Sequence, residues 1–134
     1  MDGICLAGDR GPNDPVAVAA GVAAKCLTPI GGTPMVARVV RALKESARTE
    51  RLLLCGPSAE TVGGSLELRE MMAKENVEGI APQATPCTSA AAALSALPAE
   101  EPVLVTTGDH ALLAPAMVRE FLDQAQARGG DVAV

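Results

Sequence analysis

Three segments of this 134-residue chain carry residue types that bind phosphate groups or metal ions. The loop Gly8 to Gly11 reads Gly-Asp-Arg-Gly and follows an apolar run. Its glycines let backbone N–H groups approach phosphate oxygens, and Arg10 adds positive charge. Lys25 precedes a bend rich in Pro and Gly, and Asp109 follows a second apolar run. A carboxylate in that place can hold Mg²⁺ together with substrate phosphates, so the three segments predict a site for a phosphorylated ligand.

Each segment alone has a plainer interpretation. The glycine loop can be a tight turn with a solvated Arg10, and it matches neither Gly-x-Gly-x-x-Gly nor a Walker A loop. Lys25 can be a surface lysine, and Asp109 can order the turn in which it lies. His110 is the single histidine, and no Cys, His or Glu stands near it in a motif spacing. We interpret His110 as a turn residue.

Apolar runs of strand length alternate with segments of helical periodicity, which predicts an α/β fold with a mostly parallel sheet. Ligands bind such sheets at the carboxyl ends of the strands, where the glycine loop and Asp109 stand. The expected strands are Gly3–Ala7, Arg51–Cys55, Val77–Ala81, Pro102–Thr106 and Asp131–Val134. The expected helices are Pro34–Ser46, Thr61–Lys74, Thr88–Leu97 and Pro115–Arg128. The connection from Gly8 to Thr33 is long enough to be functional.

Composition excludes several classes of protein. The net charge of −5 opposes attraction to nucleic acid or to an anionic membrane. Phe121 is the single aromatic residue, so bases cannot stack on a set of rings. The N-terminus lacks the pattern of a signal peptide, which predicts a cytoplasmic location. The four cysteines lack disulfide or zinc spacing, and we expect all of them to be reduced core residues.

A longer pattern links the first two segments. Leu6-Ala7-Gly8 opens the glycine loop, and Lys25-x-Leu-x-Pro-Ile-Gly-Gly-x-Pro-Met35 leads into the clearest helix. This pattern resembles the signature of the nucleotidyltransferase superfamily with the glycosyltransferase-A-like fold. The superfamily includes molybdenum-cofactor guanylyltransferases and sugar-phosphate nucleotidylyltransferases. The chain is similar to the N-terminal portion of a MobA-like NTP transferase domain.

The resemblance implies a Rossmann-like three-layer αβα fold, here an incomplete nucleotide-diphospho-sugar transferase fold. Residues 1–134 are expected to form one nucleotide-binding domain, truncated at its C-terminal end. The implied reaction is attack by an acceptor phosphate on the α-phosphorus of a nucleoside triphosphate, which expels pyrophosphate and requires Mg²⁺. A further metal-binding carboxylate of the family lies beyond the fifth strand. Whether these residues turn over nucleotide by themselves therefore stays open.

The resemblance also implies roles for individual residues. Arg10, Lys25 and Asp109 are the expected catalytic residues, and Asp109 is the expected ligand of Mg²⁺. Gln83 and Ser89 correspond to a stretch near the base and ribose, although Ser89 can equally be a helix cap. The residues expected to contact the nucleotide are Leu6, Ala7, Gly8, Asp9, Arg10, Gly11, Lys25, Gln83 and Ser89.

The chain departs from the family pattern in the glycine loop. Asp9 places a negative charge near the expected triphosphate, and Asn13 or Asp14 fills the usual place of a phosphate-binding arginine. These departures keep a non-catalytic nucleotide-binding or regulatory domain as an alternative. A nucleotide-sugar glycosyltransferase is a second alternative, but no second carboxylate accompanies Asp109. The expected partners are a nucleoside triphosphate, a small phosphorylated acceptor and a second copy of the chain, but neither nucleic acid nor a membrane.

Overall fold

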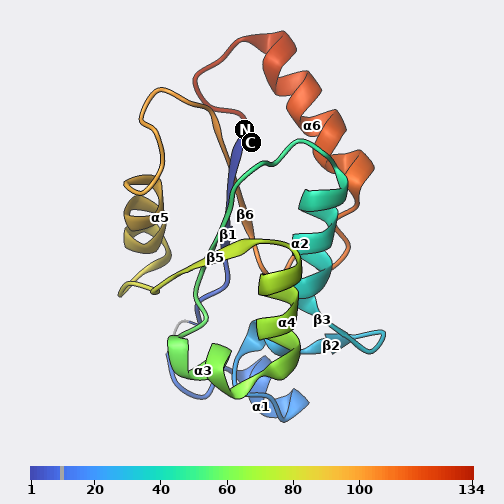
Figure 1. Cartoon of the computed structure of the whole chain (residues 1–134), viewed down its shortest axis with the longest axis vertical. Coiled ribbons are helices and arrows are strands. Elements are labelled where there is room, and N and C mark those ends of the chain that lie inside the picture. Colours follow the sequence, from blue (N-terminus) through green and yellow to red (C-terminus); the bar gives the residue numbers. More distant parts are fainter. Residues whose placement is uncertain (10) are drawn as a thin grey trace.

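A four-stranded parallel sheet forms the centre of the molecule (Figure 1). The computed structural model describes residues 1–9 and 11–134. The strands lie in the order β5-β4-β1-β6. Their bounds are β1 Asp2–Leu6, β4 Leu52–Cys55, β5 Val77–Ile80 and β6 Val103–Thr107. The predicted α/β class and mostly parallel sheet are confirmed, and four of the expected strands form within two residues of their predicted bounds.

The two central strands are buried on both faces of the sheet, which explains their continuous apolar sequences. In β1 the side chain of Cys5 belongs to one apolar cluster and that of Ile4 to another. In β4, Leu54 and Leu53 divide between the same two clusters. The alternation follows from the twofold periodicity of a strand, so a buried sheet needs apolar residues at every position.

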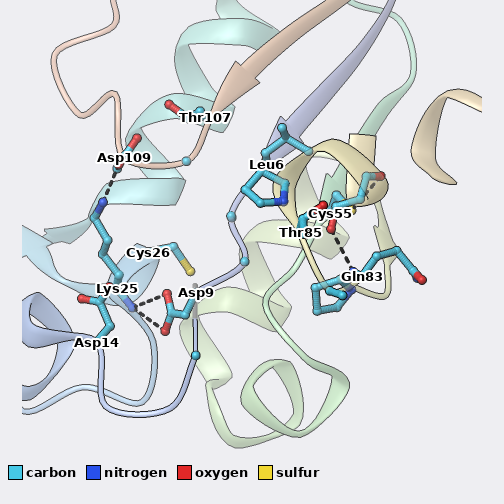
Figure 2. A pocket seen from close by; sticks show the side chains of 18 of the residues that line it. Leu6, Asp9, Asp14, Lys25, Cys26, Cys55, Gln83, Thr85, Thr107 and Asp109 are labelled. Atoms are coloured by element: carbon cyan, nitrogen blue, oxygen red, sulfur yellow. Dashed lines mark hydrogen bonds and ion pairs between the residues drawn. The ribbon is translucent and has the colours of Figure 1, made fainter. Parts of the chain in front are cut away.

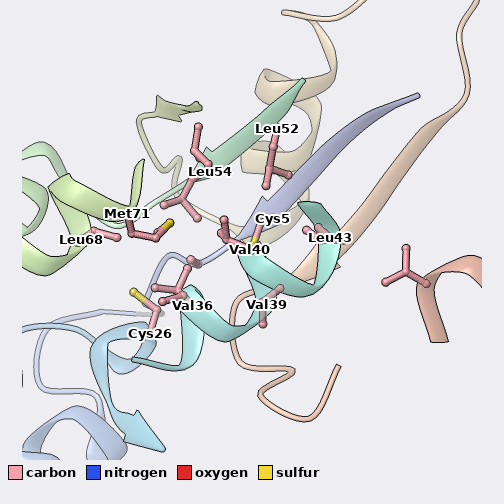
Figure 3. Close-up of a cluster of buried hydrophobic side chains, with 14 of the residues drawn as sticks. Cys5, Cys26, Val36, Val39, Val40, Leu43, Leu52, Leu54, Leu68 and Met71 are labelled. Atoms are coloured by element: carbon pink, nitrogen blue, oxygen red, sulfur yellow. The ribbon is translucent and has the colours of Figure 1, made fainter. Parts of the chain in front are cut away.

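Helices cover both faces and produce the expected three-layer αβα arrangement (Figure 1). One face carries α2 (Met35–Glu45), α4 (Leu66–Lys74) and α6 (Pro115–Arg128). The other face carries α5 (Pro86–Leu94), whose Ala93 packs against Ile4 and Leu53. The larger cluster lies between the sheet and α2 (Figure 3).

Helix α2 anchors this larger cluster. Val36, Val39, Val40 and Leu43 lie on one stripe of the helix and are at most 1% exposed. Burial of such a side chain contributes about 1.5 to 3 kcal/mol. The helix is therefore a firm support for the loop that precedes it, which contains Lys25.

Two predicted helices differ from the observed ones. The segment Thr61–Lys74 is divided into α3 (Ala59–Gly64) and α4, because Ser65 adopts an extended backbone and its hydroxyl caps α4 through the Leu68 N–H. Helix α5 begins at Pro86 rather than Thr88, since Thr85 is the N-cap and forms a capping box with Thr88.

The expected strand Asp131–Val134 is wrong. These residues have no regular secondary structure and are exposed, with Val132 at 83%. A strand requires a neighbour that accepts its backbone hydrogen bonds, and these residues pair with none of the described strands.

The expectation for the cysteines is confirmed at three positions. Cys5, Cys26 and Cys55 are buried free thiols. Cys87 is also free but exposed, so its assignment to the core was wrong. It lies in the first turn of α5, where the face toward the sheet is occupied by Ser89 and Ala93.

The long connection after β1 contains short regular elements. They are α1 (Pro15–Ala20), the 3₁₀ helix η1 (Lys25–Leu27) and a hairpin of β2 (Pro29–Ile30) with β3 (Thr33–Pro34). The connection leaves β1 and leads to the start of α2 (Figure 1). Within it, Lys25 lies beside Asp9, which follows β1, and Asp109, which follows β6 (Figure 2). Within the described part of the chain, no helix has both the length and the apolarity to cross a bilayer.

Candidate nucleotide site

A cavity of about 710 Å³ opens at the carboxyl ends of the parallel strands (Figure 2). Three loops form its walls: the residues after β1, residues 82–86 after β5, and residues 107–109 at the end of β6. Lys25, from the long connection, closes the side between β1 and β6. Strands that run parallel bring their carboxyl ends to one edge, which is how distant segments share this cavity.

Two glycines allow the loops to approach one another. A Cβ atom on Gly108 would lie 2.8 Å from the Cβ of Ala7. A Cβ on Gly56 would lie 2.7 Å from the Cα of Gly8, and Gly56 has a φ of 74°. Side chains at either position would push the loops apart, so the glycines permit the close packing beneath the cavity.

Lys25 and Asp109 are in contact although they lie 84 positions apart in the sequence. Lys25 Nζ lies 2.5 Å from Asp109 Oδ2. The two side chains are 34% and 43% exposed, so water reaches the pair. The hydrogen bond from Lys25, with a further one from the Thr107 side chain, lowers the pKa of Asp109 below its usual value. Asp109 is thus a carboxylate at neutral pH and faces the cavity with Lys25 beside it.

Asp9 binds the backbone of Lys25, whereas Asp109 binds its side chain. Both oxygens of its carboxylate accept the backbone N–H of Lys25, each at 3.2 Å. Desolvation raises the pKa of Asp9 above its usual value, and the nearby Asp14 raises it further, although the bond from Lys25 opposes the change. The backbone N–H of Lys25, a residue that lines the cavity, is therefore already bound to the carboxylate of Asp9.

The wall formed by residues 82–86 and α5 is held by uncharged groups. The Ser89 hydroxyl accepts the N–H of Gln83 at 2.8 Å, and Ser89 is 6% exposed. The Gln83 side-chain amide donates to the carbonyl of Ala81 at 3.3 Å. Thr85 and Thr88 close the first turn of α5. Ser89 therefore shapes the wall, and the exposed Gln83 presents polar groups at its surface.

All but one of the residues expected at the site can be placed. The described ones border the same cavity: Leu6, Ala7, Gly8, Asp9, Gly11, Lys25, Gln83, Ser89 and Asp109. Arg10 lies outside the described residues. His110 is exposed and is not among the lining residues, and its N–H donates to the Thr107 carbonyl in the turn, as expected of a turn residue.

Sequence reasoning did not assign several lining residues to the site, among them Asp14, Thr85 and Cys26. Asp14 caps α1 by accepting the N–H groups of Val16 and Ala17, a role that its position directly before Pro15 indicates. Thr85 stands before Pro86 in the same way. Cys26 lines the cavity as a neutral thiol, because burial raises its pKa to about 12. Only the fold reveals that this thiol faces the cavity.

The described residues that line the cavity can supply part of a Mg²⁺ site but not a complete set of ligands. Apart from residue 10, which is not described, no three His, Cys, Asp or Glu side chains gather as a metal-binding group. Mg²⁺, however, commonly takes one or two carboxylates and completes its shell with phosphate oxygens and water. Asp109 is ionised and faces the cavity, so it can supply the share of the protein in such a site.

Two solved structures have the same fold. A hypothetical transferase from Thermus thermophilus superposes with a TM-score of 0.67 at 28% identity, covering 93% of this chain and 47% of its own. A CMP:2-keto-3-deoxy-manno-octonic acid synthetase, complexed with CTP, superposes with a TM-score of 0.65 at 13% identity, covering 95% and 48%. The chain thus spans about half the length of either structure. The search of curated proteins found no match.

The family model of the MobA-like NTP transferase domain matches residues 3–134. The match includes the glycine loop, the Lys25 segment and the Asp109 turn, which together surround the cavity. The chain therefore belongs to the MobA-like NTP transferase family.

Proposed function

We propose that the protein is a Mg²⁺-dependent nucleotidyltransferase that joins a nucleotide to a small phosphorylated acceptor. An acceptor phosphate oxygen attacks the α-phosphorus of a nucleoside triphosphate, and the bond to the departing pyrophosphate breaks. The contact of Lys25 with Asp109 at the edge of the cavity carries this proposal. A cation and an anchored carboxylate lie side by side at the carboxyl end of β6, and phosphoryl chemistry requires groups of both kinds.

The side of Lys25 and Asp109 receives the phosphates. The backbone amides of the loop Gly8 to Gly11, with Arg10 by its place in the sequence, bind the β- and γ-phosphates. Lys25 neutralises negative charge along the reaction path. Asp109 holds Mg²⁺, which when bound polarises the phosphate oxygens. The protein contributes mainly position and charge, because transfer between oxygens needs little covalent help.

The uncharged wall receives the nucleoside. Gln83 presents an exposed side-chain amide, and Leu6 adds apolar surface to the same cavity. Ser89 supports the loop from beneath through the Gln83 N–H. We therefore propose that the base and ribose lie near α5 and the triphosphate near β6. The fold of the relative complexed with CTP is consistent with a nucleotide in this cavity.

A non-catalytic nucleotide-binding or regulatory domain is the second candidate, and Asp9 favours it. The Asp9 carboxylate occupies the Lys25 N–H and faces the cavity, where it repels a triphosphate. Such a domain would bind Mg²⁺-nucleotide weakly and release no pyrophosphate.

Calorimetry and a turnover assay distinguish the two candidates. Each of the four common nucleoside triphosphates is titrated into the protein with Mg²⁺ and with EDTA. The full-length protein is then assayed for pyrophosphate release with a set of phosphorylated acceptors. The transferase predicts Mg²⁺-dependent binding and release with at least one pair. Binding without release from any pair favours the regulatory domain, and no binding contradicts both.

The cellular setting follows from the same proposal. Nucleoside triphosphates and phosphorylated metabolites are cytoplasmic, so we propose a cytoplasmic enzyme. The net charge of −5 disfavours nucleic acid and anionic membranes as partners. A second copy of the chain is the macromolecular partner that we propose.

A further inference from the structure

Arg38 contacts two segments next to the site and is not among the residues that line the cavity. It lies in the first turn of α2 and is partly buried. Its Nε donates to the carbonyl of Ala111 at 3.0 Å, and its Nη1 donates to the carbonyl of Ile30 at 3.4 Å. Ala111 follows the Asp109 turn, and Ile30 belongs to the hairpin that follows Lys25.

The position of Arg38 in the helix is unusual. The first turn of a helix carries the positive end of the helix dipole, and a cation there is unfavourable. No carboxylate pairs with Arg38 among the described residues. The two carbonyl contacts are therefore the interactions that account for an arginine in this place.

Each contacted carbonyl is linked to a residue of the site. The N–H of Ala111 donates to the carbonyl of Asp109 at 2.9 Å. On the other side, the N–H of Thr28 donates to the carbonyl of Lys25 at 3.0 Å, and Ile30 lies two residues further along. Arg38 thus connects, through short paths, the two segments whose side chains form the ion pair.

We propose that Arg38 is a positioning residue, which joins the Lys25 segment to the Asp109 turn and so maintains the distance between Lys25 Nζ and the Asp109 carboxylate. A guanidinium suits the role because its planar set of donors reaches two carbonyls at once. The catalytic consequence rests on the proposed function. The physical connection between the two segments does not.

Amide hydrogen exchange of the unliganded protein tests the connection directly. In Arg38→Met, exchange of the Ala111 and Thr28 amides is expected to accelerate about tenfold, because a charged donor to each segment is lost. Exchange of the Val40 and Leu43 amides inside α2 is expected to remain as in the wild type. Arg41→Met is the matched control, since it removes the same charge from an exposed position of the same helix.

The outcomes are distinct. Unchanged exchange at Ala111 and Thr28 overturns the proposal, and so does an equal acceleration in Arg41→Met or throughout α2. Arg38→Lys keeps the charge but loses the paired geometry, and it is expected to accelerate exchange to a smaller extent. If Arg38→Met does not fold, Arg38→Lys is measured against the same control and the same criteria apply.

A turnover measurement separates this inference from the proposed function. In the full-length protein, Arg38→Met is expected to lower kcat about tenfold with a smaller change in KM, with partial recovery in Arg38→Lys and none of these effects in Arg41→Met. Altered exchange in a protein whose wild type releases no pyrophosphate would support the role of Arg38 and contradict the transferase. Turnover in the wild type with unaltered exchange in Arg38→Met would support the transferase and contradict the role of Arg38.

Discussion

The two walls of the cavity are built by different means. On the side of β1 and β6, an ion pair joins Lys25 to Asp109 across 84 positions, and Asp9 binds the Lys25 backbone across 16. On the side of α5, hydrogen bonds join Gln83 to Ser89 and Thr85 to Thr88, six and three positions apart. The first wall is charged and assembled by the fold, whereas the second is neutral and assembled locally.

This difference is the basis on which we propose where the two halves of the ligand bind. Phosphates and a metal ion need charge, and the charged wall supplies it. A base and a ribose need apolar contact and neutral polar groups, which the α5 wall offers. Substitutions in the charged wall should therefore alter metal-dependent steps and pH dependence, and substitutions in the neutral wall should alter mainly stability and the fit of the nucleoside.

The largest effect is expected from Asp109→Asn in the full-length protein. The substitution removes the negative charge of the proposed Mg²⁺ ligand, and pyrophosphate release should fall by about 10² to 10³. Asp123→Asn is the control, because Asp123 pairs with Arg48 in an ion pair that lies outside the cavity. Full Mg²⁺-dependent activity in Asp109→Asn would contradict the proposed role of Asp109 in binding Mg²⁺.

Lys25→Met should weaken Mg²⁺-nucleotide binding about tenfold, as measured by calorimetry, because a cation beside the phosphates is lost. Its effect on the free energy of unfolding should be below about 1 kcal/mol, since the ion pair with Asp109 is exposed to water. Arg48→Met, which breaks the comparable pair with Asp123, should affect stability as little and leave binding unchanged. Equal binding losses in the two variants would contradict the assignment.

The pH dependence of this stability effect has a definite sign. Lys25 lowers the pKa of Asp109, so its stabilisation is complete above the usual value of 3.8 and is lost as the pH falls through the lowered pKa. In urea unfolding at pH 6, the wild type should have a higher free energy of unfolding than Lys25→Met. This difference should vanish at pH values below the lowered pKa of Asp109. A difference that grows with acid would show that another group is responsible.

Asp9→Asn should tighten nucleotide binding about fivefold. The amide keeps an acceptor for the Lys25 N–H and removes a negative charge, whose repulsion at contact distance in water is about 1 kcal/mol. Because the pKa of Asp9 is raised, protonation removes the same charge as the pH falls, so the advantage of the variant should shrink toward acid. The titration of the nucleotide itself affects both proteins equally. Weaker binding in Asp9→Asn would mean that the carboxylate serves the ligand.

The smallest effect on binding is expected from the neutral wall. Ser89→Ala leaves the Gln83 N–H without its acceptor and should lower the free energy of unfolding by about 1 kcal/mol in urea. Nucleotide affinity should fall less than about threefold, with no change in its Mg²⁺ or pH dependence. Ser95→Ala removes a hydroxyl at the exposed end of α5 and controls for helix stability. A Mg²⁺-dependent loss of nucleotide affinity in Ser89→Ala would contradict the distinction between the charged and the neutral wall.

Most strands and helices could be predicted because each has an apolar pattern within its own segment of the sequence. The apolar strand Leu52–Cys55 and the stripe of α2 are visible as patterns, since burial on both faces or on one face imposes them. The strand expected at Asp131–Val134 failed because a run of three apolar residues after Asp131 does not contain its pairing partner.

For the site, the sequence predicted the types of residue but not the contacts that position them. The residue types follow from the glycine loop and from the chemistry of Lys25 and Asp109. The Ser89 bond to Gln83 and the path from Arg38 to both loops were not predictable, because they depend on how α5 and α2 pack and not on any motif. Local chemistry was thus easier to read from the sequence than the contacts that organise it.

The most direct test is a crystal structure with a non-hydrolysable nucleoside triphosphate and Mn²⁺, located by its anomalous signal. We predict a manganese peak beside Asp109, the phosphates over the loop Gly8 to Gly11, and the base against the α5 wall. A nucleotide bound outside this cavity, or one within it whose phosphates lie at α5 with no metal near Asp109, would contradict the account.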